Sequence, residues 1–517
     1  MKNINLSSVL EEINNHTWWL EEAPGVYAFV GWPLRAFIEQ AKYFHPKYLT
    51  LSVFIYRNDF FSELTPADEK LKVYYYIYDQ VLKNKNYLKN LRKASEKFVS
   101  HFLAAGKILE KNISNVNNKQ LWKFYQNFYG EKAYMDFIRY GMALECTDIF
   151  SSEKLIGLIK KETSGLSENK ALDIAITFSA PVKLSFLEKE EYLIFKGAIL
   201  AYKILSDKNK IESEKIILKL PTLRIILKKL VKSYFWIGNN FQKAQILDEQ
   251  YFLDRMKILA LEKTKNELLA IFNNFSTKVS RLKQAKKKYL KQYNFSKNLK
   301  RHFLIVAYMA EWIDDRKKFM TIADHYNEIF CQQVAKRFKQ DVGLVKYYTS
   351  EEFHDLLINN KKVLTALLES RRKFSAQVVI RSKNWRCEEK IFYGGQAKSI
   401  YNLFSKILNG TEIKGQVACA PVEKISGKAQ VILDVNRQNF KAGNILVTTM
   451  TRPEFLPLLR RVKAIVTDEG GLTCHAAIVS RELGVPCIIG TKTATRILKN
   501  NDLIEMDMNN GTVKKIK

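Results

Sequence analysis

The pattern of residue types in this 517-residue chain changes at about residue 406. Before that point the chain has few Gly or Pro, and apolar residues recur three or four positions apart, as in the segment from Asp68 to Leu109. After it, short β-branched runs alternate with Gly, Asn and Asp. This change predicts a mainly helical region at 1–405, with room for two subdomains, then a linker at 406–414 and a compact domain at 415–517.

The pattern of the last hundred residues is typical of an α/β domain, in which strands and helices alternate. An Asn-Gly pair at 510–511 between two extended runs predicts a terminal hairpin. The fold class predicted for the whole chain is multidomain, α followed by α/β. Strands are expected within 427–435, 444–450, 463–470 and 486–491, and helices within 453–462, 473–483 and 493–500.

The composition is that of a soluble globular protein, with 47% hydrophobic and 26% charged residues. The apolar runs are shorter than the roughly 18 residues of a membrane span. The first residues do not resemble a secretory signal, so we expect no membrane association and a cytoplasmic location. Six scattered cysteines without a CxxC pair predict neither a disulfide framework nor a zinc site.

The net charge of +31 is the extreme number of the composition. Lys, Asn and Ile are frequent throughout the chain, and this bias favours a solvated basic surface over a dedicated nucleic-acid site. The densest basic segment, 281–303, also has apolar residues near helical spacing. We therefore do not expect nucleic acid as a partner, although an anion-binding face stays open.

His475 lies in the segment VTDEGGLTCHAAIVSREL, 466–483, which is predicted to be a strand, a glycine turn and a helix that opens near Thr473. A helix N-terminus offers unpaired N–H groups and a positive dipole end, which suit phosphate. A neutral imidazole there has a nucleophilic nitrogen and can form covalent intermediates. On these features alone, a phosphoryl-accepting histidine and a capped, structural histidine are about equally favoured. A metal site is not expected, since no further ligand stands at suitable spacing.

The segment VTDEGGLTCHAAIVSRELGVPCIIGT, 466–491, closely resembles the phosphohistidine signature of the mobile, or swivelling, domain of phosphoenolpyruvate-utilising enzymes. This family includes phosphoenolpyruvate synthase, pyruvate phosphate dikinase and rifampicin phosphotransferase. The segments GKAQVILD, KAGNILVTTMTRPEFLPLL and GTVKKI match the same domain in order and spacing, so the resemblance covers about 411–517. It implies a small swivelling β/β/α domain whose histidine is phosphorylated by a nucleotide-binding domain and then moves to a second site.

The resemblance implies a role for each matching residue. His475 is implied as the phosphoryl carrier and catalytic residue. Thr451 and Arg452, in the TRPE motif, are implied to line the same face, although a helix start explains Arg452 equally well. Arg481 and Glu482 are expected to cap or brace the helix rather than to touch phosphate. The implied phosphate cradle comprises Gly470, Gly471 and the backbone around Thr473 and Cys474.

Thr473 also matches the position of a threonine that is phosphorylated for regulation in the synthases and dikinases. A second dianion beside the first would block transfer of the phosphoryl group. A plain helix cap explains the same residue, and the cap is the preferred interpretation.

We find no counterpart of the glycine-rich ATP-grasp segments in 1–405, and no (β/α)8 barrel follows the hairpin. The order of regions is most similar to the helical acceptor-binding part and histidine domain of rifampicin phosphotransferase. We therefore expect a phosphotransferase component with no cofactor bound by its own motifs, with ATP and Mg²⁺ on an ATP-grasp-type partner, or with phosphoenolpyruvate as donor. The acceptor is unknown.

Three alternatives stay open for the function. The first is a non-catalytic regulatory or binding protein that retains a phosphohistidine domain. The second is a divergent, fragment-like relative of phosphoenolpyruvate synthase. The third is a nucleic-acid-binding protein that uses its basic surface. Binding that weakens steeply with salt would favour the last.

Overall fold

The computed structural model divides the chain into two compact units. One comprises Met1–Ser152, Asn240–Gln242 and Tyr326–Lys517, and the other comprises Glu153–Asn239 and Lys243–His325. The two units are described separately below. The structure describes residues 4–27, 50–113, 115–129, 153–206, 220–241, 244–381, 387–407, 413–433, 435, 438–451, 455–471 and 474–516.

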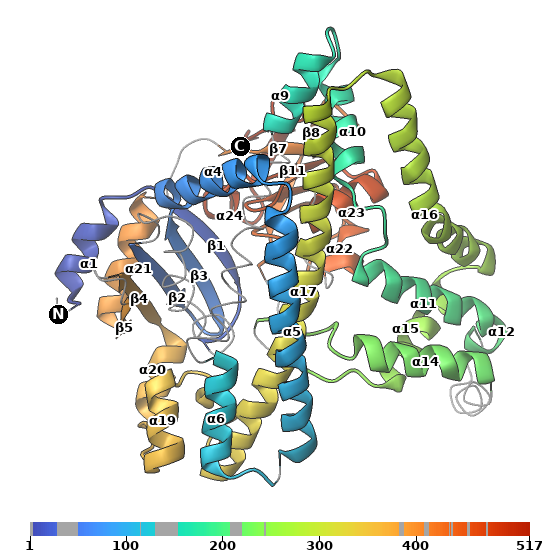
Figure 1. Cartoon of the computed structure of the whole chain (residues 1–517). Coiled ribbons are helices and arrows are strands. Elements are labelled where there is room, and N and C mark those ends of the chain that lie inside the picture. Colours follow the sequence, from blue (N-terminus) through green and yellow to red (C-terminus); the bar gives the residue numbers. More distant parts are fainter. Residues whose placement is uncertain are drawn as a thin grey trace. The chain divides into compact units, whose positions relative to one another are not determined.

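The first unit contains a five-stranded antiparallel sheet in the region where the sequence predicts mainly helices (Figure 1). The sequence does not predict this sheet, whereas the expectation of a mainly helical region before residue 406 is confirmed. Its strands, in the order β1-β3-β2-β4-β5, are β1 (Trp18–Pro24), β2 (Leu51–Tyr56), β3 (Phe60–Pro66), β4 (Ser375–Arg381) and β5 (Cys387–Tyr393).

The connection between β2 and β3 is a tight hairpin turn. Asn58 and Asp59 both have positive φ, at 50° and 64°. Arg57 and Phe60 exchange two backbone hydrogen bonds across them, at 2.7 and 3.2 Å. Positive φ at both central residues matches the right-handed twist of the strands, and Asn and Asp tolerate it best after Gly.

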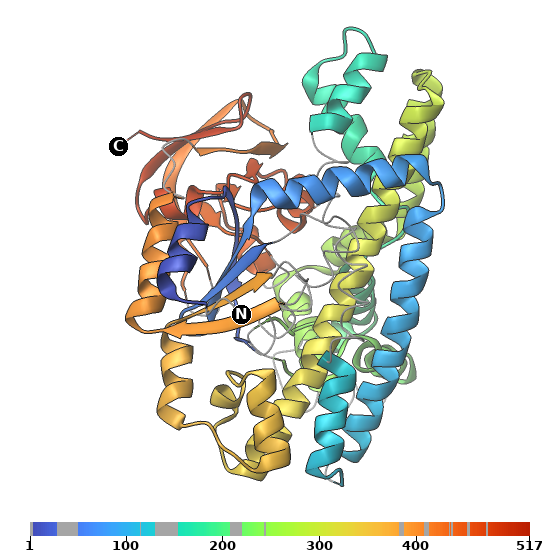
Figure 2. The same cartoon turned by 60° about the vertical axis from the view of Figure 1, so that its left-hand side comes forward.

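Two helices cover one face of this sheet, α1 (Leu6–Ile13) and α21 (Gly395–Ile407) (Figure 2). Their apolar residues recur at helical spacing and meet alternate residues of the strands. The buried cluster includes Val9, Ile13, Val53, Ile55, Leu64, Val378, Ile400 and Phe404.

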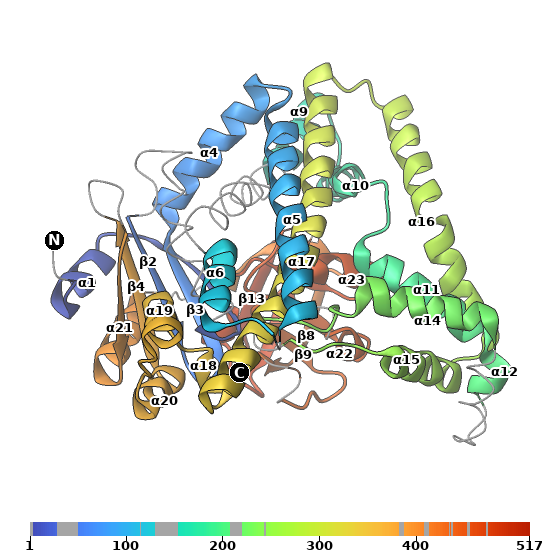
Figure 3. The same cartoon turned by 60° about the horizontal axis from the view of Figure 1, so that its bottom comes forward.

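The remaining helices of the first unit pack on one another partly through aromatic contacts. Within this unit α5 and the end of α17 lie side by side, where Gly106 approaches the Tyr326 ring (Figure 3). These helices are α4 (Ala67–Lys83), α5 (Tyr87–Asn112), α6 (Asn118–Tyr129), α18 (Val342–Val345), α19 (Ser350–Asn359) and α20 (Thr365–Lys373), together with the end of α17 (Lys297–Phe338), which passes from one unit into the other.

The second unit is helical throughout its described residues. Helix α11 lies at its centre and packs against α14, α15 and α16, and Gly197 of α11 allows close approach of Met256. Capping boxes start α11 at Ser185 and α16 at Thr264. The helices are α9 (Glu153–Glu162), α10 (Glu168–Ser179), α11 (Phe186–Leu200), α12 (Tyr202–Leu205), α14 (Pro221–Tyr234), α15 (Glu249–Glu262), α16 (Lys265–Gln292) and the first part of α17.

The C-terminal part of the first unit contains an eight-stranded mixed sheet in the order β6-β13-β12-β8-β9-β10-β11-β7. Strands β8, β9, β10 and β11 run parallel, and the outer pairs are antiparallel. The strands are β6 (Ile413–Lys414), β7 (Gln416–Cys419), β8 (Lys424–Val431), β9 (Ile445–Thr448), β10 (Ala464–Thr467), β11 (Cys487–Ile489), β12 (Leu503–Asp507) and β13 (Thr512–Lys515).

The structure confirms the four strands and the terminal hairpin that the sequence predicts here. Both faces of the central parallel strands β9, β10 and β11 are buried, as is usual for parallel sheets. One face packs on α24 (Ala494–Ile497), and the other packs on α22 (Leu456–Leu459) and α23 (His475–Leu483). Within its described residues α22 is shorter than the helix predicted at 453–462.

Among the helices that the structure describes, none combines the length and apolar character needed to cross a membrane.

Candidate functional site

The candidate site lies where the parallel strands β9 and β10 end. Thr448 and Thr467 are paired in register as the last residues of these strands. The chain stays paired just beyond them, because the Asp468 and Glu469 N–H groups donate to the carbonyls of Thr448 and Thr449 at 3.0 and 2.8 Å. The carboxyl ends of parallel strands meet at one edge of a sheet, which is where ligand sites of α/β domains usually lie.

Helix α23 begins at His475, and Cys474 is its N-cap. The extended Cys474 accepts a hydrogen bond at Sγ from the Ala477 N–H at 3.4 Å. The helix ends at Gly484, which has φ of +66° and donates its N–H to the Ser480 carbonyl. The sequence assigned the cap to Thr473, and this assignment was wrong because the extended cap residue is one position later.

The imidazole of His475 contacts Thr451, which follows β9. The distance from Thr451 Oγ1 to His475 Nδ1 is 2.9 Å. Thr451 is buried, with 7% of its surface exposed, and His475 is half-buried. The structure thus brings together the two residues that the resemblance placed on one face, although they are 24 positions apart in the chain.

Gly470 allows the turn before α23 to close tightly. Its φ is +117°, and a Cβ at this position would lie 2.6 Å from Cys474 Sγ. Gly490, directly after β11, has φ of +70°, and its Cβ would lie 3.1 Å from the Gly470 carbonyl oxygen. The ends of three parallel strands therefore converge at Gly470, and any side chain there would displace the N-cap of α23.

Gly471 connects this turn to the helix, because its carbonyl accepts the Cys474 N–H at 2.9 Å. Of the predicted cradle, Gly470, Gly471 and Cys474 thus lie together beside His475. Thr473, with its predicted regulatory role, and Arg452 lie outside the described residues.

Asp468 is a buried residue of the site that the sequence reasoning missed. Its carboxylate accepts hydrogen bonds from Thr491 Oγ1 at 3.0 Å and from the Thr495 N–H at 3.3 Å, and the Thr495 hydroxyl also donates to it. Burial raises the pKa of Asp468, and these hydrogen bonds oppose that rise. The sequence did contain a signal for Asp468, because an acidic residue directly follows the apolar strand β10. Asp468 ties the start of the glycine turn to the segment that follows β11.

Arg481 lies on α23 near the thiols of Cys419, Cys474 and Cys487, and burial lowers the pKa of its guanidinium. It occupies the inner side of the helix, whereas Glu482 is exposed. These positions fit the bracing role expected for Arg481. Among the described residues, no group of three or more His, Cys, Asp or Glu side chains could hold a metal ion.

The arrangement combines an imidazole in the first turn of a helix with a tight glycine turn directly before it. The first-turn N–H groups and the helix dipole favour a negative group. Of these N–H groups, that of Ala477 donates to Sγ of the cap residue Cys474. The geometry suits a histidine that accepts an anionic group.

Residues 440–511 match the family model described as "PEP-utilising enzyme, mobile domain". The same region is similar to synthases from archaea. It is 49% identical over 89 residues to a probable phosphoenolpyruvate synthase of Methanothermobacter thermautotrophicus. It is 54% identical over 89 residues to a probable phosphoenolpyruvate synthase of Archaeoglobus fulgidus, and 53% identical over 91 residues to the phosphoenolpyruvate synthase of Pyrococcus furiosus.

Each of these similarities covers 17% of this chain and only 13%, 12% and 11% of the respective relative. The matched part contains Thr451, Gly470 and His475, and so contains the site built above. The mobile domain that the sequence suggested is confirmed over 440–511.

Proposed function

We propose that this chain is a phosphotransferase component that carries a phosphoryl group on His475. The observation that supports this most directly is the position of His475 within a matched mobile domain, at the first residue of α23, with Nδ1 engaged by Thr451. Its relatives in this region are named phosphoenolpyruvate synthases, and the proposal extends phosphoryl transfer from them to this chain.

The contact with Thr451 selects the nitrogen that reacts. If Nδ1–H donates to Thr451 Oγ1, Nε2 keeps its lone pair and is the nucleophile. Nε2 then attacks the phosphorus of the donor, a P–N bond forms, and the P–O bond to the leaving group breaks. Because Nδ1 keeps its proton throughout, Thr451 holds the same hydrogen bond before and after transfer.

The start of α23 stabilises the charge that His475 then carries. A phosphoryl group brings close to two negative charges next to a helix terminus worth about half a positive charge. Gly470 keeps side-chain atoms away from this region, since its Cβ would meet the cap residue Cys474. Positioning and charge neutralisation do most of the work in phosphoryl transfer generally.

The donor and acceptor in this proposal lie outside the mobile domain. Residues 1–405 show no ATP-grasp segments in the sequence, so an ATP-grasp-type partner chain would hold ATP and Mg²⁺ and load His475 in trans. The helical region would hold the acceptor, in the manner of rifampicin phosphotransferase, whose order of regions it resembles. Phosphoenolpyruvate is the alternative donor.

A labelling experiment tests this proposal. The protein is incubated with ³²P-labelled ATP and a candidate ATP-grasp partner, and separately with ³²P-labelled phosphoenolpyruvate. We expect label that is stable in base and labile in acid, and that disappears in His475→Ala. The matched control is His101→Ala, which removes an exposed histidine of α5 and should keep the label. Label that persists in His475→Ala, or that no donor produces, contradicts the proposal.

A further inference from the structure

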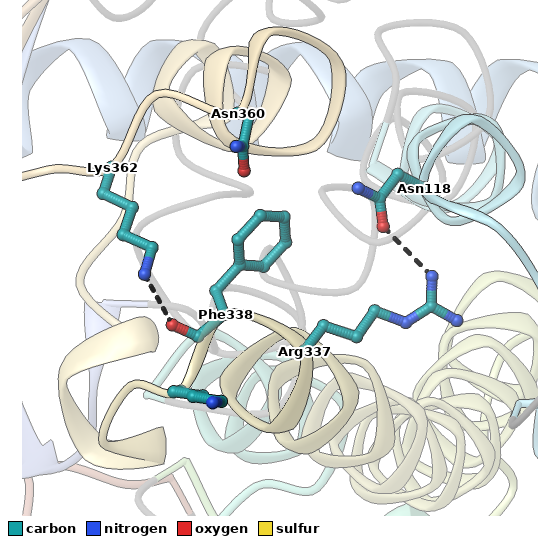
Figure 4. A pocket seen from close by; sticks show the side chains of 6 residues that line it. Asn118, Arg337, Phe338, Asn360 and Lys362 are labelled. Carbon is teal, nitrogen blue, oxygen red and sulfur yellow. Dashed lines mark hydrogen bonds between the residues drawn. The ribbon is translucent and has the colours of Figure 1, made fainter.

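A cavity of about 520 Å³ lies at the end of α17 in the first unit, among residues that neither the mobile domain nor the phosphohistidine site uses (Figure 4). Its size is within the range of pockets that bind small molecules. Three segments line it: the start of α6, the end of α17 and the chain directly after α19. The lining residues are Asn118, Arg337, Phe338, Lys339, Asn360 and Lys362.

The cavity is lined by cations and amides. Arg337, Lys339 and Lys362 are cationic, Asn118 and Asn360 carry amides, and no acid is among the lining residues. Figure 4 shows the Phe338 ring in the middle of this set, with Asn360 and Lys362 on one side and Asn118 on the other. Phe338 is the apolar residue of this lining, and only 6% of its surface is exposed.

Neutral acceptors hold two of the cations in place. Arg337 donates to Asn118 Oδ1 at 3.0 Å and also to the carbonyl of Val116. The Lys362 ammonium donates to the Phe338 carbonyl at 2.9 Å. Within the ranges that the structure describes, no ion pair joins any of the three cations to a carboxylate. Partial burial also lowers the pKa of Arg337, since the guanidinium loses water.

The acids that are nearest in sequence are engaged elsewhere. Asp341 caps α18 and accepts the Leu344 N–H at 3.0 Å. Asp355 accepts from Asn359 at 3.0 Å and lies 3.7 Å from Lys361. Neither carboxylate lines the cavity.

Helix termini do not balance this charge. The carbonyls at the end of α17 amount to about half a negative charge, which explains the attraction of cations to that end. The start of α6, where Asn117 and Gln120 form reciprocal capping bonds of 2.9 and 2.7 Å, contributes about half a positive charge. The partial charges of the two helix termini cancel. The charges of the three cations, about +3 in total, are then balanced by a ligand or by solvent.

We propose that this cavity binds a small molecule that carries a multiply charged anionic group of the phosphate type. Arg337 offers a planar set of donors, and Lys339 and Lys362 offer mobile ammonium groups, which together match a phosphate or pyrophosphate group. This site is independent of phosphoryl transfer by His475.

Calorimetric titration of the full chain with inorganic pyrophosphate at low salt tests the site, with orthophosphate as the smaller probe. We expect binding that Lys362→Gln weakens about tenfold, or about 1.4 kcal/mol. The matched control is Lys361→Gln, which removes the same charge from the neighbouring residue outside the cavity and should change the affinity less than twofold. Lys362→Arg should restore binding. Thermal unfolding of each variant shows whether the fold is kept.

Two results would overturn the site. Equal weakening in Lys361→Gln and Lys362→Gln would show that pyrophosphate responds only to the general charge of +31. If the unmodified chain binds neither pyrophosphate nor phosphate, the cavity is not a site for ligands of the phosphate type. Labelling of His475 by a donor is measured separately, and neither result depends on it.

Discussion

At the scale of single residues, the role proposed for Thr451 rests on its 2.9 Å contact with His475 Nδ1. Thr451→Val keeps the shape of the side chain but removes the hydroxyl. A hydrogen bond to a buried group is worth about 1–3 kcal/mol, so we expect phosphoryl loading to slow about tenfold or more. The rate of labelling from the donor measures this. ³¹P NMR of the labelled protein identifies the phosphorylated nitrogen.

Thr451→Ser is the control for this prediction, because serine keeps the hydroxyl and should load close to the normal rate. Loading of Thr451→Val at an unchanged rate, with phosphate still on Nε2, would show that Thr451 does not set the tautomer.

Gly470 and Gly443 offer a matched test of the turn before α23. Both have positive φ, at +117° and +83°. A Cβ at Gly470 would lie 2.6 Å from Cys474 Sγ, whereas a Cβ at Gly443 has no atom within 4 Å. We expect Gly443→Ala to lower the free energy of unfolding by about 1 kcal/mol and Gly470→Ala by about 2–3 kcal/mol, with slower loading of His475.

Denaturant unfolding measures both glycine variants. Equal losses of stability in the two variants would mean that Cys474 moves aside at little cost, and that Gly470 matters only for its backbone angle.

The sequence predicted the residues of the site that are close in the chain better than those brought together by the fold. His475, Gly470 and Cys474 lie within six positions, and one strand–turn–helix pattern contains them all. Asp468 is different, since its partners Thr491 and Thr495 are 23 and 27 positions away. Its burial follows from the parallel pairing of β10 with β11, which a local pattern does not contain.

At the scale of elements, the antiparallel sheet of the first unit shows why strands can escape sequence analysis. All six residues of β2 are buried, so the strand has no alternation of polar and apolar residues. Its partner β4 is more than 300 residues away, with Phe54 paired to Gln377. The Asn58–Asp59 turn was the available local signal of a hairpin.

A buried glutamate on helix α11 predicts that the stability of the protein depends on pH. Glu190 is buried beside Arg255, and burial raises its pKa to about 7 from the 4.5 of an exposed glutamate. A raised pKa means that the folded state binds the proton more tightly than the unfolded state. This contribution is therefore fully present below about pH 4.5 and is lost as the pH rises through 7.

We expect the free energy of unfolding to fall by up to about 3 kcal/mol between pH 5 and 8 from this group, at about 1.4 kcal/mol per pKa unit. Glu190→Gln, which is neutral at every pH, should flatten the profile over this range. Urea unfolding at several pH values measures it. A wild-type profile that matches the variant would show that Arg255 keeps Glu190 ionised.

At the scale of the whole molecule, the division into compact units does not follow the change in residue pattern at about residue 406. The second unit, which begins at Glu153 and ends at His325, interrupts the first unit. Helix α17 continues through the boundary between His325 and Tyr326, so no change of pattern marks the division there. The mobile domain was predictable because its strands, turns and helices are local and its motif is long.

A dense stretch of basic residues lies on α16 and the start of α17, where residues 268–310 contain no Asp or Glu. Lys283, Lys287, Lys288 and Lys291 are exposed on α16. Three of them stand at i, i+4 spacing, and like charges at that spacing destabilise a helix by about 0.2–0.5 kcal/mol per pair. Replacing all four by Gln should therefore leave the protein as stable or slightly more stable.

The same fourfold variant shows whether the basic face of α16 is only solvated or takes part in phosphoryl transfer. We expect it to elute from heparin at lower salt, because fewer cations displace counterions from a polyanion. Labelling of His475 by its donor should stay within twofold of the unmodified chain if this face is only solvated. A tenfold slower labelling with an unchanged fold would instead mean that α16 docks the donor or neutralises the phosphoryl group, and would place the basic helix in the transfer reaction.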